Sequence, residues 1–387
     1  MQQQERQRLF DLLSIPTAPF REQAIHAHAV ERLQQAGVAH FTDPYGNLVV
    51  GVDSPVAYRR LLRQHSQEPV RLFIAHMDHP GFHGRRWHDD RTLEIAWHGG
   101  SPVRHLRNAR VWLADARGYV GTGRLQAVEL HEKGYCITRA RVRTEGELRR
   151  GVSARKLFGG FAFRKPVWRS GARVYTKAAD DLVGVHCILE TAVRLKRTGE
   201  RPFLGLLTRA EEVGFVGAVA HFELGWLETR RRPLVCVSLE ASRTLPGACI
   251  GRGPVVRLGD RRTVFEANAM QLLDELAART LKDGYQRRIM DGGSCEATAA
   301  TAFGLPTVGL TVPLGNYHNE GYEGGADCPR MRGPAPEFVN LRDVEGMRRL
   351  CQALMRRNLP WQDPWRGVRR RLQRNRKGYG ALLKEWN

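Results

Sequence analysis

The chain has 387 residues, 42% of them hydrophobic, so it can bury a sizeable core and is long enough for roughly two or three domains. It has no run of about 18 apolar residues, which excludes a helix that spans a membrane. Its first residues are charged and rich in glutamine where a secretory signal needs an apolar segment, so we expect a cytoplasmic protein. The 61 Lys and Arg residues against 40 Asp and Glu give a net charge of +21, which favours attraction to nucleic acid, acidic lipid or acidic substrates.

The N-terminal part carries the pattern of an α/β domain. Residues 5–36 have the period of one or two amphipathic helices, interrupted at Pro16 and Pro19. Residues 44–52 predict a turn and a strand, and residues 71–82 predict a buried strand that ends in a polar loop. A helix followed by such strands is typical of an α/β domain.

The character of the sequence changes after this opening and then returns. Short β-like runs separated by glycines and charged turns predict a mostly antiparallel β-domain, inserted at residues 84–168. Strands and helices then alternate, which implies a largely parallel sheet. We therefore predict an α/β fold with a mixed, largely parallel sheet flanked by helices and an inserted β-rich domain, with the α/β domain formed by residues 1–83 and 169–359. The elements expected after the insertion are helices at 182–197, 213–223, 265–282 and 341–357 and strands at 203–208, 234–239 and 306–312.

The last segment, residues 360–387, is basic and aromatic. A run of like charge usually faces water, so we predict a solvated basic helix packed by its aromatic residues, with weak nonspecific binding of anions as the alternative. The segment contains Arg366, Arg369, Arg370, Arg371, Arg374, Arg376, Lys377 and Lys384 against Asp363 and Glu385, with Trp361, Trp365, Tyr379 and Trp386 interleaved.

Polar side chains occur where several strands of the α/β domain are expected to end, which is where open parallel sheets place their ligand sites. Each has an ordinary structural explanation by itself: Asp180 and Asp181 precede a helix and suit an N-cap, and adjacent glutamates suit the start of a helix. Their recurrence at successive strand ends favours one shared site. The set consists of His76, Asp78, Asp180, Glu211, Glu212, Glu240 and His318.

Imidazole and carboxylate groups together suit zinc or a similar divalent ion. Two ions a few ångströms apart need one ligand that bridges them, and we expect Asp180 to be that bridge. His76 and Asp78 are two residues apart and lie on one face of an extended chain, so Asp78 can hold the second ring nitrogen of His76. Glu211 and Glu212 are adjacent, so one can bind a metal while the other acts as a general base.

The motifs HMDHPGF, KAADDLVG, RAEEVGFVGA and NYHN, with the strand that ends in Glu240, resemble those of the co-catalytic zinc aminopeptidases. The likeness is closest to the tetrahedral, dodecameric aminopeptidases and the endoglucanase-like or deblocking peptidases. It extends from residue 8 or so to residue 357. It implies a zinc-exopeptidase-like fold and a homo-oligomer that assembles through the inserted domain, with no counterpart for the basic tail.

The resemblance also implies roles for single residues. It puts His76, Asp180 and Glu240 on one metal, and His318, Asp180 and Glu212 on the other. It implies that Glu211 is the general base and that Asp78 is the acid that orients His76. It further implies two divalent ions, with zinc expected and cobalt or manganese as alternatives, and a cis peptide bond between Asp180 and Asp181.

The sequence departs from the family pattern at three places. Glu240 stands where the family commonly has Asp, which keeps a ligand but changes its reach. The GGSCEA segment at residues 292–297 replaces a GGTDA-like loop, and its Glu296 is either a contact for the substrate amine or a surface acid. His79, His83 and His88 lie beyond the strand end and are interpreted as loop residues.

These observations predict a dinuclear metal-dependent aminopeptidase that hydrolyses N-terminal residues of short peptides. A related metal-dependent amidohydrolase, such as an N-acyl amino acid deacylase or a carboxypeptidase-like enzyme, is the alternative among enzymes, because the same metals cleave any amide that fits. A protein that binds anions or nucleic acid through its basic surface is the non-enzymatic alternative.

Overall fold

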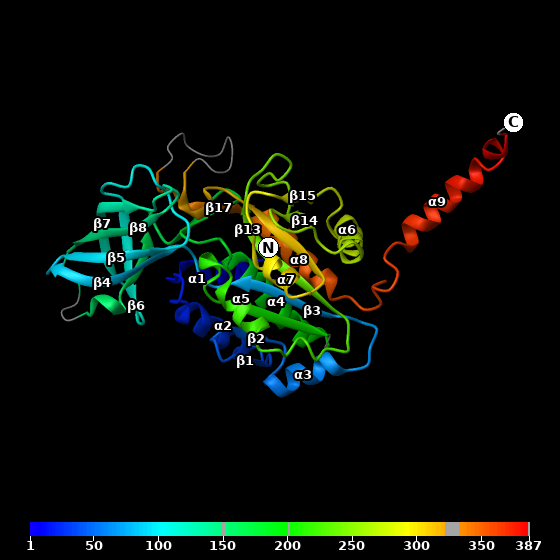
Figure 1. Cartoon of the computed structure of the whole chain (residues 1–387), viewed down its shortest axis with the longest axis horizontal. Coiled ribbons are helices and arrows are strands. Elements are labelled where there is room, and N and C mark those ends of the chain that lie inside the picture. The colour runs from blue at the N-terminus through cyan, green and yellow to red at the C-terminus, as the bar shows by residue number, and fades with distance from the viewer. Residues whose placement is uncertain (147, 149–151, 200–201, 322–332, 386–387) are drawn as a thin grey trace.

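The computed structural model describes residues 1–146, 148, 152–199, 202–321 and 333–385. Figure 1 shows a central sheet between helices, a barrel at one end of the long axis, and a C-terminal helix that leaves the body at the other end. Among the described residues, no helix is both long enough and apolar enough to cross a membrane.

The main sheet has eight strands in the order β1-β2-β12-β3-β13-β16-β14-β15. The four central strands β12, β3, β13 and β16 are parallel to one another, whereas β2 and β14 join them antiparallel. The predicted fold class is therefore confirmed. The strands are β1 (His40–Thr42), β2 (Leu48–Val50), β3 (Val70–His76), β12 (Phe203–Thr208), β13 (Leu234–Arg243), β14 (Val255–Asp260), β15 (Gln286–Met290) and β16 (Thr307–Leu314).

Helices cover both faces of this sheet, which is why every residue of β3, β12 and β16 is buried. One apolar core lies between the sheet and helices α1, α2, α4, α6 and α8. A second core lies between the opposite face and helices α3, α5 and α7. The helices are α1 (Gln3–Ser14), α2 (Gln23–Gln35), α3 (Pro55–Arg63), α4 (Leu182–Thr198), α5 (Val216–Phe222), α6 (Ala267–Leu281), α7 (Glu296–Ala302) and α8 (Leu341–Leu354).

Between β3 and α4 the chain forms a closed barrel with the strand order β4-β5-β8-β7-β6-β9. Buried and exposed residues alternate along β8, so one face of that strand fills the barrel core. The barrel begins five residues after His76, so its first strand is tied to the edge of the site. The division into domains at residues 84, 169 and 360 stays a prediction. The barrel strands are β4 (Gly81–Asp89), β5 (Thr92–His98), β6 (Arg110–Asp115), β7 (Gly118–Leu130), β8 (Ile137–Glu145) and β9 (Phe158–Phe161).

A small three-stranded sheet, β10-β11-β17, joins the return from the barrel to the start of α8. Its strands are β10 (Val167–Ser170), β11 (Arg173–Thr176) and β17 (Glu337–Asn340). All its neighbours are antiparallel, and the register places Thr176 opposite Glu337. This sheet was not predicted, and it brings the end of β11 beside the start of β17.

The basic tail forms helix α9 (Arg366–Gly378), which has no buried residue. The predicted solvated helix is present, but it is not packed by its aromatic residues as expected: the side chain of Tyr379 is 68% exposed. Trp365, just before the helix, is held by a hydrogen bond from its indole Nε1 to Oδ1 of Asn268 at 2.9 Å. Trp386 lies outside the described residues.

Candidate metal centre

The central strands and the loops that follow them bring all five predicted ligands together. His76 is the last residue of β3, and Asp180 lies in the loop between β11 and α4. Glu212 lies in the short 3-10 helix Glu211–Val213 after β12, and His318 in a similar turn after β16. Glu240 differs slightly from expectation, since it lies inside β13 rather than at its end.

The carboxylate of Asp180 lies between the two histidines. Its Oδ1 is 3.5 Å from Nε2 of His76, and its Oδ2 is 3.8 Å from Nε2 of His318. One carboxylate therefore presents a different oxygen to each imidazole. The side chain of Asp180 is only 5% exposed, so its carboxylate is shielded from bulk water.

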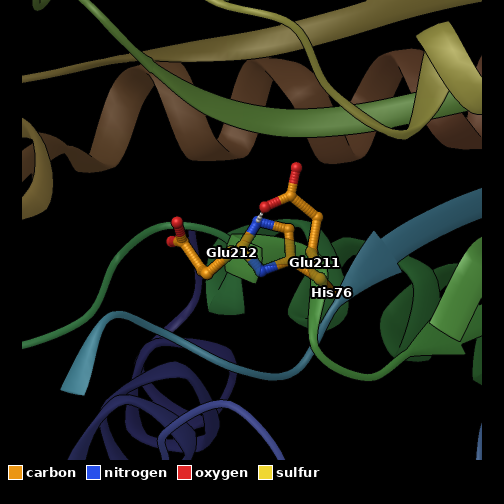
Figure 2. A group of neighbouring side chains, drawn as sticks. All are labelled: His76, Glu211 and Glu212. Carbon is orange, nitrogen blue, oxygen red and sulfur yellow. Dashed lines mark ion pairs between the residues drawn. The ribbon is translucent and has the colours of Figure 1, made fainter. Parts of the chain in front are cut away.

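The adjacent glutamates diverge from one another. Figure 2 shows the carboxylate of Glu211 beside the ring of His76 and that of Glu212 turned to the other side. Oε2 of Glu211 is 3.9 Å from Nε2 of His76, whereas Oε2 of Glu212 is 3.1 Å from Nε2 of His318.

The described residues form three groups that could hold a metal ion, and within each group the potential ligand atoms lie within 4.8 Å of one another. The groups are His76 with Asp180 and Glu240, Asp180 with Glu212 and His318, and His76 with Glu211 and Glu212. The first two groups share Asp180 and match the ligand sets that the resemblance implies. The third shows that Glu211 lies within the same cluster and is not directed to solvent.

Asp78 is completely buried, and it contacts both His76 and the turn that carries the two glutamates. Nδ1 of His76 is 3.2 Å from the backbone oxygen of Asp78 and 3.7 Å from its carboxylate. The two carboxylate oxygens instead accept the backbone N–H groups of Glu211 at 3.0 Å and Glu212 at 3.1 Å. Asp78 thus fixes the turn that carries both glutamates, and its carbonyl group faces the histidine.

The loop after β11 has the predicted backbone form. The Asp180–Asp181 peptide bond is cis, as expected from the resemblance. Asp181 is the N-cap of α4, and its Oδ1 accepts the N–H of Gly184 at 3.1 Å. The acid pair therefore divides its roles: Asp180 enters the cluster and Asp181 caps the helix.

Glu337 is a member of the site that the sequence did not reveal. It is 0% exposed, and its Oε2 accepts the N–H of Ala179 at 2.7 Å and of Asp180 at 3.2 Å. Its Oε1 accepts the N–H of His318 at 3.0 Å. One carboxylate thereby joins the segments that carry Asp180 and His318. Its partners are backbone groups, which leave no pattern in a sequence.

Three further residues are placed differently from expectation: His83, His88 and Glu296. His79 lies in the loop after β3, as expected, but it is buried: its Nδ1 is 3.0 Å from the backbone oxygen of Asp180 and its Nε2 is 3.2 Å from Oδ1 of Asn319. His83 and His88 lie in strand β4, so their interpretation as loop residues is wrong. Glu296 is 1% exposed and is hydrogen-bonded to Thr208, so its interpretation as a surface acid is wrong.

The electrostatics reflect carboxylates held out of water. Burial, reinforced by the charges of Glu212 and Glu240, raises the pKa of Glu211 well above its usual value, although His76 partly offsets it. Burial also opposes the charged form of Glu212, but the neighbouring His318 outweighs this and lowers the pKa of Glu212 to about 2. Burial lowers the pKa of His76, yet Glu211 and Asp180 together raise it well above its usual value.

Such a cluster requires positive charge, either from protons or from a bound cation. The residue types fit a divalent cation, because imidazole and carboxylate are the ligands of catalytic zinc sites. Oε1 of Glu212 and Oε1 of Glu240 are buried and have no hydrogen-bond partner among the described residues. Oxygens in that state are costly unless a cation or a proton compensates them. The donor set therefore fits metal ions.

A narrow cavity of about 40 Å³ opens beside the cluster. The residues that line it include His76, Asp180, Glu211 and Glu240 together with residues 292–295. This places the GGSCEA segment where it can contact a small ligand bound next to the cluster.

A model of the M42 glutamyl aminopeptidase family matches residues 60–322. A TET aminopeptidase from a marine sediment archaeon of the Thaumarchaeota has a similar structure, with a TM-score of 0.71 and 19% identity over 92% of this chain and 97% of that one. The TET1 peptidase of Pyrococcus horikoshii, which can assemble into a tetrahedron or a large octahedral shell, has a TM-score of 0.69 and 20% identity over 91% of this chain and 99% of that one. An aminopeptidase from the archaeon Desulfurococcus kamchatkensis has a TM-score of 0.70 and 19% identity over 92% and 96%. No curated protein matches the chain.

Proposed function

The chain belongs to the M42 glutamyl aminopeptidase family, and we propose that its buried cluster is a dinuclear metal centre that removes N-terminal residues from short peptides. Family membership makes the chain a metal-dependent aminopeptidase. The observation that carries the dinuclear proposal is the position of Asp180, whose two oxygens face two different histidines. A carboxylate suits this role because it has two oxygens to share between two ions.

In this proposal His76, Asp180 and Glu240 hold one ion, and His318, Asp180 and Glu212 hold the other. Zinc is the expected ion, with cobalt or manganese as alternatives. When bound, the two ions would supply Lewis acidity for the scissile carbonyl and a water of lowered pKa. The carboxylates of Glu337 and Asp78 accept backbone N–H groups of the ligand-bearing segments and so keep these segments in place.

Glu211 is proposed as the general base. It lies beside His76 but belongs to neither proposed ligand set, so its carboxylate is available to the reacting groups. Its pKa is raised, first by burial, and a carboxyl group of raised pKa is suited to exchange protons near neutral pH. It would take the proton of the attacking water and return it to the leaving amine.

The test is hydrolysis of amino acid amides and dipeptides by metal-reconstituted protein, each substrate in its free-amine and N-acetylated form. We expect cleavage of the free-amine forms and loss of activity with a chelator. Preferential cleavage of the N-acetylated forms would instead support the deacylase alternative, which the family match does not favour.

The Glu211→Gln variant tests the assigned base within the same assay. It should lower kcat by roughly two to four orders of magnitude, the contribution typical of general acid–base catalysis, while metal content stays unchanged. Near-normal hydrolysis across the panel by this variant would contradict the role of Glu211.

We further propose that the chain forms a homo-oligomer through its barrel and acts in the cytoplasm. The assemblies named for the similar structures support the first point. Light scattering of the purified protein would test it, because a mass near the 43.8 kDa of one chain would contradict an assembly.

A further inference from the structure

Helix α9 is joined to the body only at its start. Trp365 donates its hydrogen bond to Asn268 of α6, and Arg369 pairs with Asp363 just before the helix. Beyond these contacts the helix projects from the body, and none of its residues is buried (Figure 1).

A helix of this kind lacks the usual sources of stability. Isolated helices shorter than about 12 to 15 residues are marginal in water, and most helices gain their stability by packing one face. Arg366, Arg370 and Arg374 are also spaced four residues apart, and like charges at this spacing destabilise a helix. These features indicate that an anionic partner stabilises α9.

Apolar residues recur along α9 and the turn that follows it. Val368 and Leu372 are one turn apart in α9, and Tyr379, Leu382 and Leu383 follow in the turn and the 3-10 helix Leu382–Lys384 after it. The exposed fractions of Leu372, Tyr379 and Leu383 are 58%, 68% and 70%. The apolar stripe is defined here as these residues together with Val368 and with Leu382, which is 63% exposed.

The rest of the segment is strongly basic. Between residues 366 and 385 there are eight Arg or Lys residues and one acid, Glu385. A second copy of this chain is expected at the barrel, which lies at the other end of the long axis from α9 (Figure 1). Nucleic acid would pair with the basic residues, but binding to its phosphates would not bury the exposed leucines of the stripe.

A basic face opposite a stripe of Leu, Val and Tyr is the pattern of helices that lie in the plane of a membrane interface. The arginines meet acidic headgroups, and the apolar stripe enters the boundary of the acyl chains. We propose that α9 and the turn that follows it bind the surface of a bilayer rich in anionic phospholipid and so hold the peptidase at that surface. The hydrolytic site lies in the body and is left free by this attachment.

The test uses the full chain and cosedimentation with vesicles at physiological ionic strength. One vesicle is phosphatidylcholine alone, and the other is an equimolar mixture with phosphatidylglycerol. The wild-type protein is expected to bind the mixed vesicles at least tenfold more tightly than the neutral ones. Equal binding to both, or to neither, would overturn the proposal.

Two triple variants separate the two faces of α9. Leu372→Ser with Leu382→Ser and Leu383→Ser removes most of the apolar stripe at unchanged charge, and Arg370→Gln with Arg371→Gln and Arg374→Gln removes charge. Each is expected to weaken binding to the mixed vesicles at least tenfold while peptidase activity is unchanged. The matched control, Arg139→Gln with Arg141→Gln and Arg143→Gln, removes the same charge from exposed positions of β8 and should bind as the wild type does.

Binding to a labelled DNA duplex and light scattering identify the rival partners. If the arginine variant loses DNA binding and the leucine variant keeps full vesicle binding, the partner is nucleic acid and the proposal fails. If the leucine variant changes the oligomeric mass and leaves vesicle binding intact, the stripe belongs to a contact between copies and the proposal also fails. Loss of vesicle binding by the β8 control would assign the attraction to net charge alone and would overturn the role of α9.

Discussion

Asp180 and Glu337 act together at the centre of the site. Asp180 faces both histidines, and Glu337 holds the backbone of Asp180 and of His318 from the opposite side. The spacing of the two halves of the cluster therefore depends on a residue that does not belong to either proposed ligand set. Buried polar groups of this kind are costly to disturb, because a donor left without its acceptor loses its hydration as well.

Glu337→Gln tests this positioning role. The amide keeps one oxygen but turns an NH2 group toward backbone N–H donors, at a cost of about 1–3 kcal/mol for a buried donor left unsatisfied. We expect the apparent metal affinity to fall roughly tenfold or more, with activity recovering at higher metal concentration. Metal titration followed by activity measures both.

Glu266→Gln is the matched control, because Glu266 also accepts two backbone N–H groups, of Asn268 and Ala269, but at the start of α6. It should leave metal affinity unchanged. A Glu337→Gln protein with wild-type metal affinity would show that the carboxylate is dispensable for the spacing.

The elements that carry the ligands were largely predictable, whereas those that support them were not. The predicted strand at 203–208 and helix at 182–197 match β12 and α4 to within one residue, because each has a clear apolar period and a defined start. Helix α3 was missed although Ser54 caps it, because only Tyr58 and Leu62 are buried along it. Strand β15 at the sheet edge has one fully buried residue, so it carries no strand pattern.

The loop at the end of β5 links the barrel to the metal centre. Gly99 and Gly100 follow this strand, and a Cβ on Gly100 would overlap the ring of His318. A Cβ on Gly99 would lie 3.3 Å from Cβ of Glu212. The barrel therefore contributes directly to the wall of the site, beyond any role in assembly.

Gly100→Ala should displace His318 and weaken the centre that it shares with Asp180 and Glu212. We expect elemental analysis to show loss of metal from that centre, together with a fall in kcat. Gly378→Ala is the control, because a Cβ there meets no atom within 4 Å. Full metal content and normal turnover in Gly100→Ala would mean that the loop yields without moving the ligand.

At the scale of the whole molecule, the barrel brings together strands that lie far apart in the sequence. Strand β4 pairs with β9, so closure joins residues Phe82 and Gly159 across the whole insertion. The periodicity of single strands predicts an antiparallel β-domain but does not encode this closing pair. The same holds for the candidate metal centre. Its proposed ligands are predicted one by one from strand ends, but the supporting residue Glu337 comes from a strand pairing that the sequence does not predict.

Metal binding should also affect the stability of the whole molecule. Buried carboxylates of raised pKa, such as Glu211 and Glu240, are compensated by a cation only in the folded state. A free metal concentration of 100 times the Kd of the site adds about 2.7 kcal/mol to the free energy of unfolding. We therefore expect a chelator to lower Tm and added zinc to restore it, and an identical Tm with and without the chelator would contradict a metal centre in this cluster.

The number of metal ions per chain in Asp180→Ala, set against wild type and Glu211→Gln, tests the central claim most directly. Elemental analysis after dialysis should find two ions per chain in the wild type and in Glu211→Gln, because Glu211 belongs to neither proposed ligand set. Asp180→Ala should lose the metal, because its carboxylate is shared by both centres. Two ions still bound in Asp180→Ala would show that Asp180 is not the bridge.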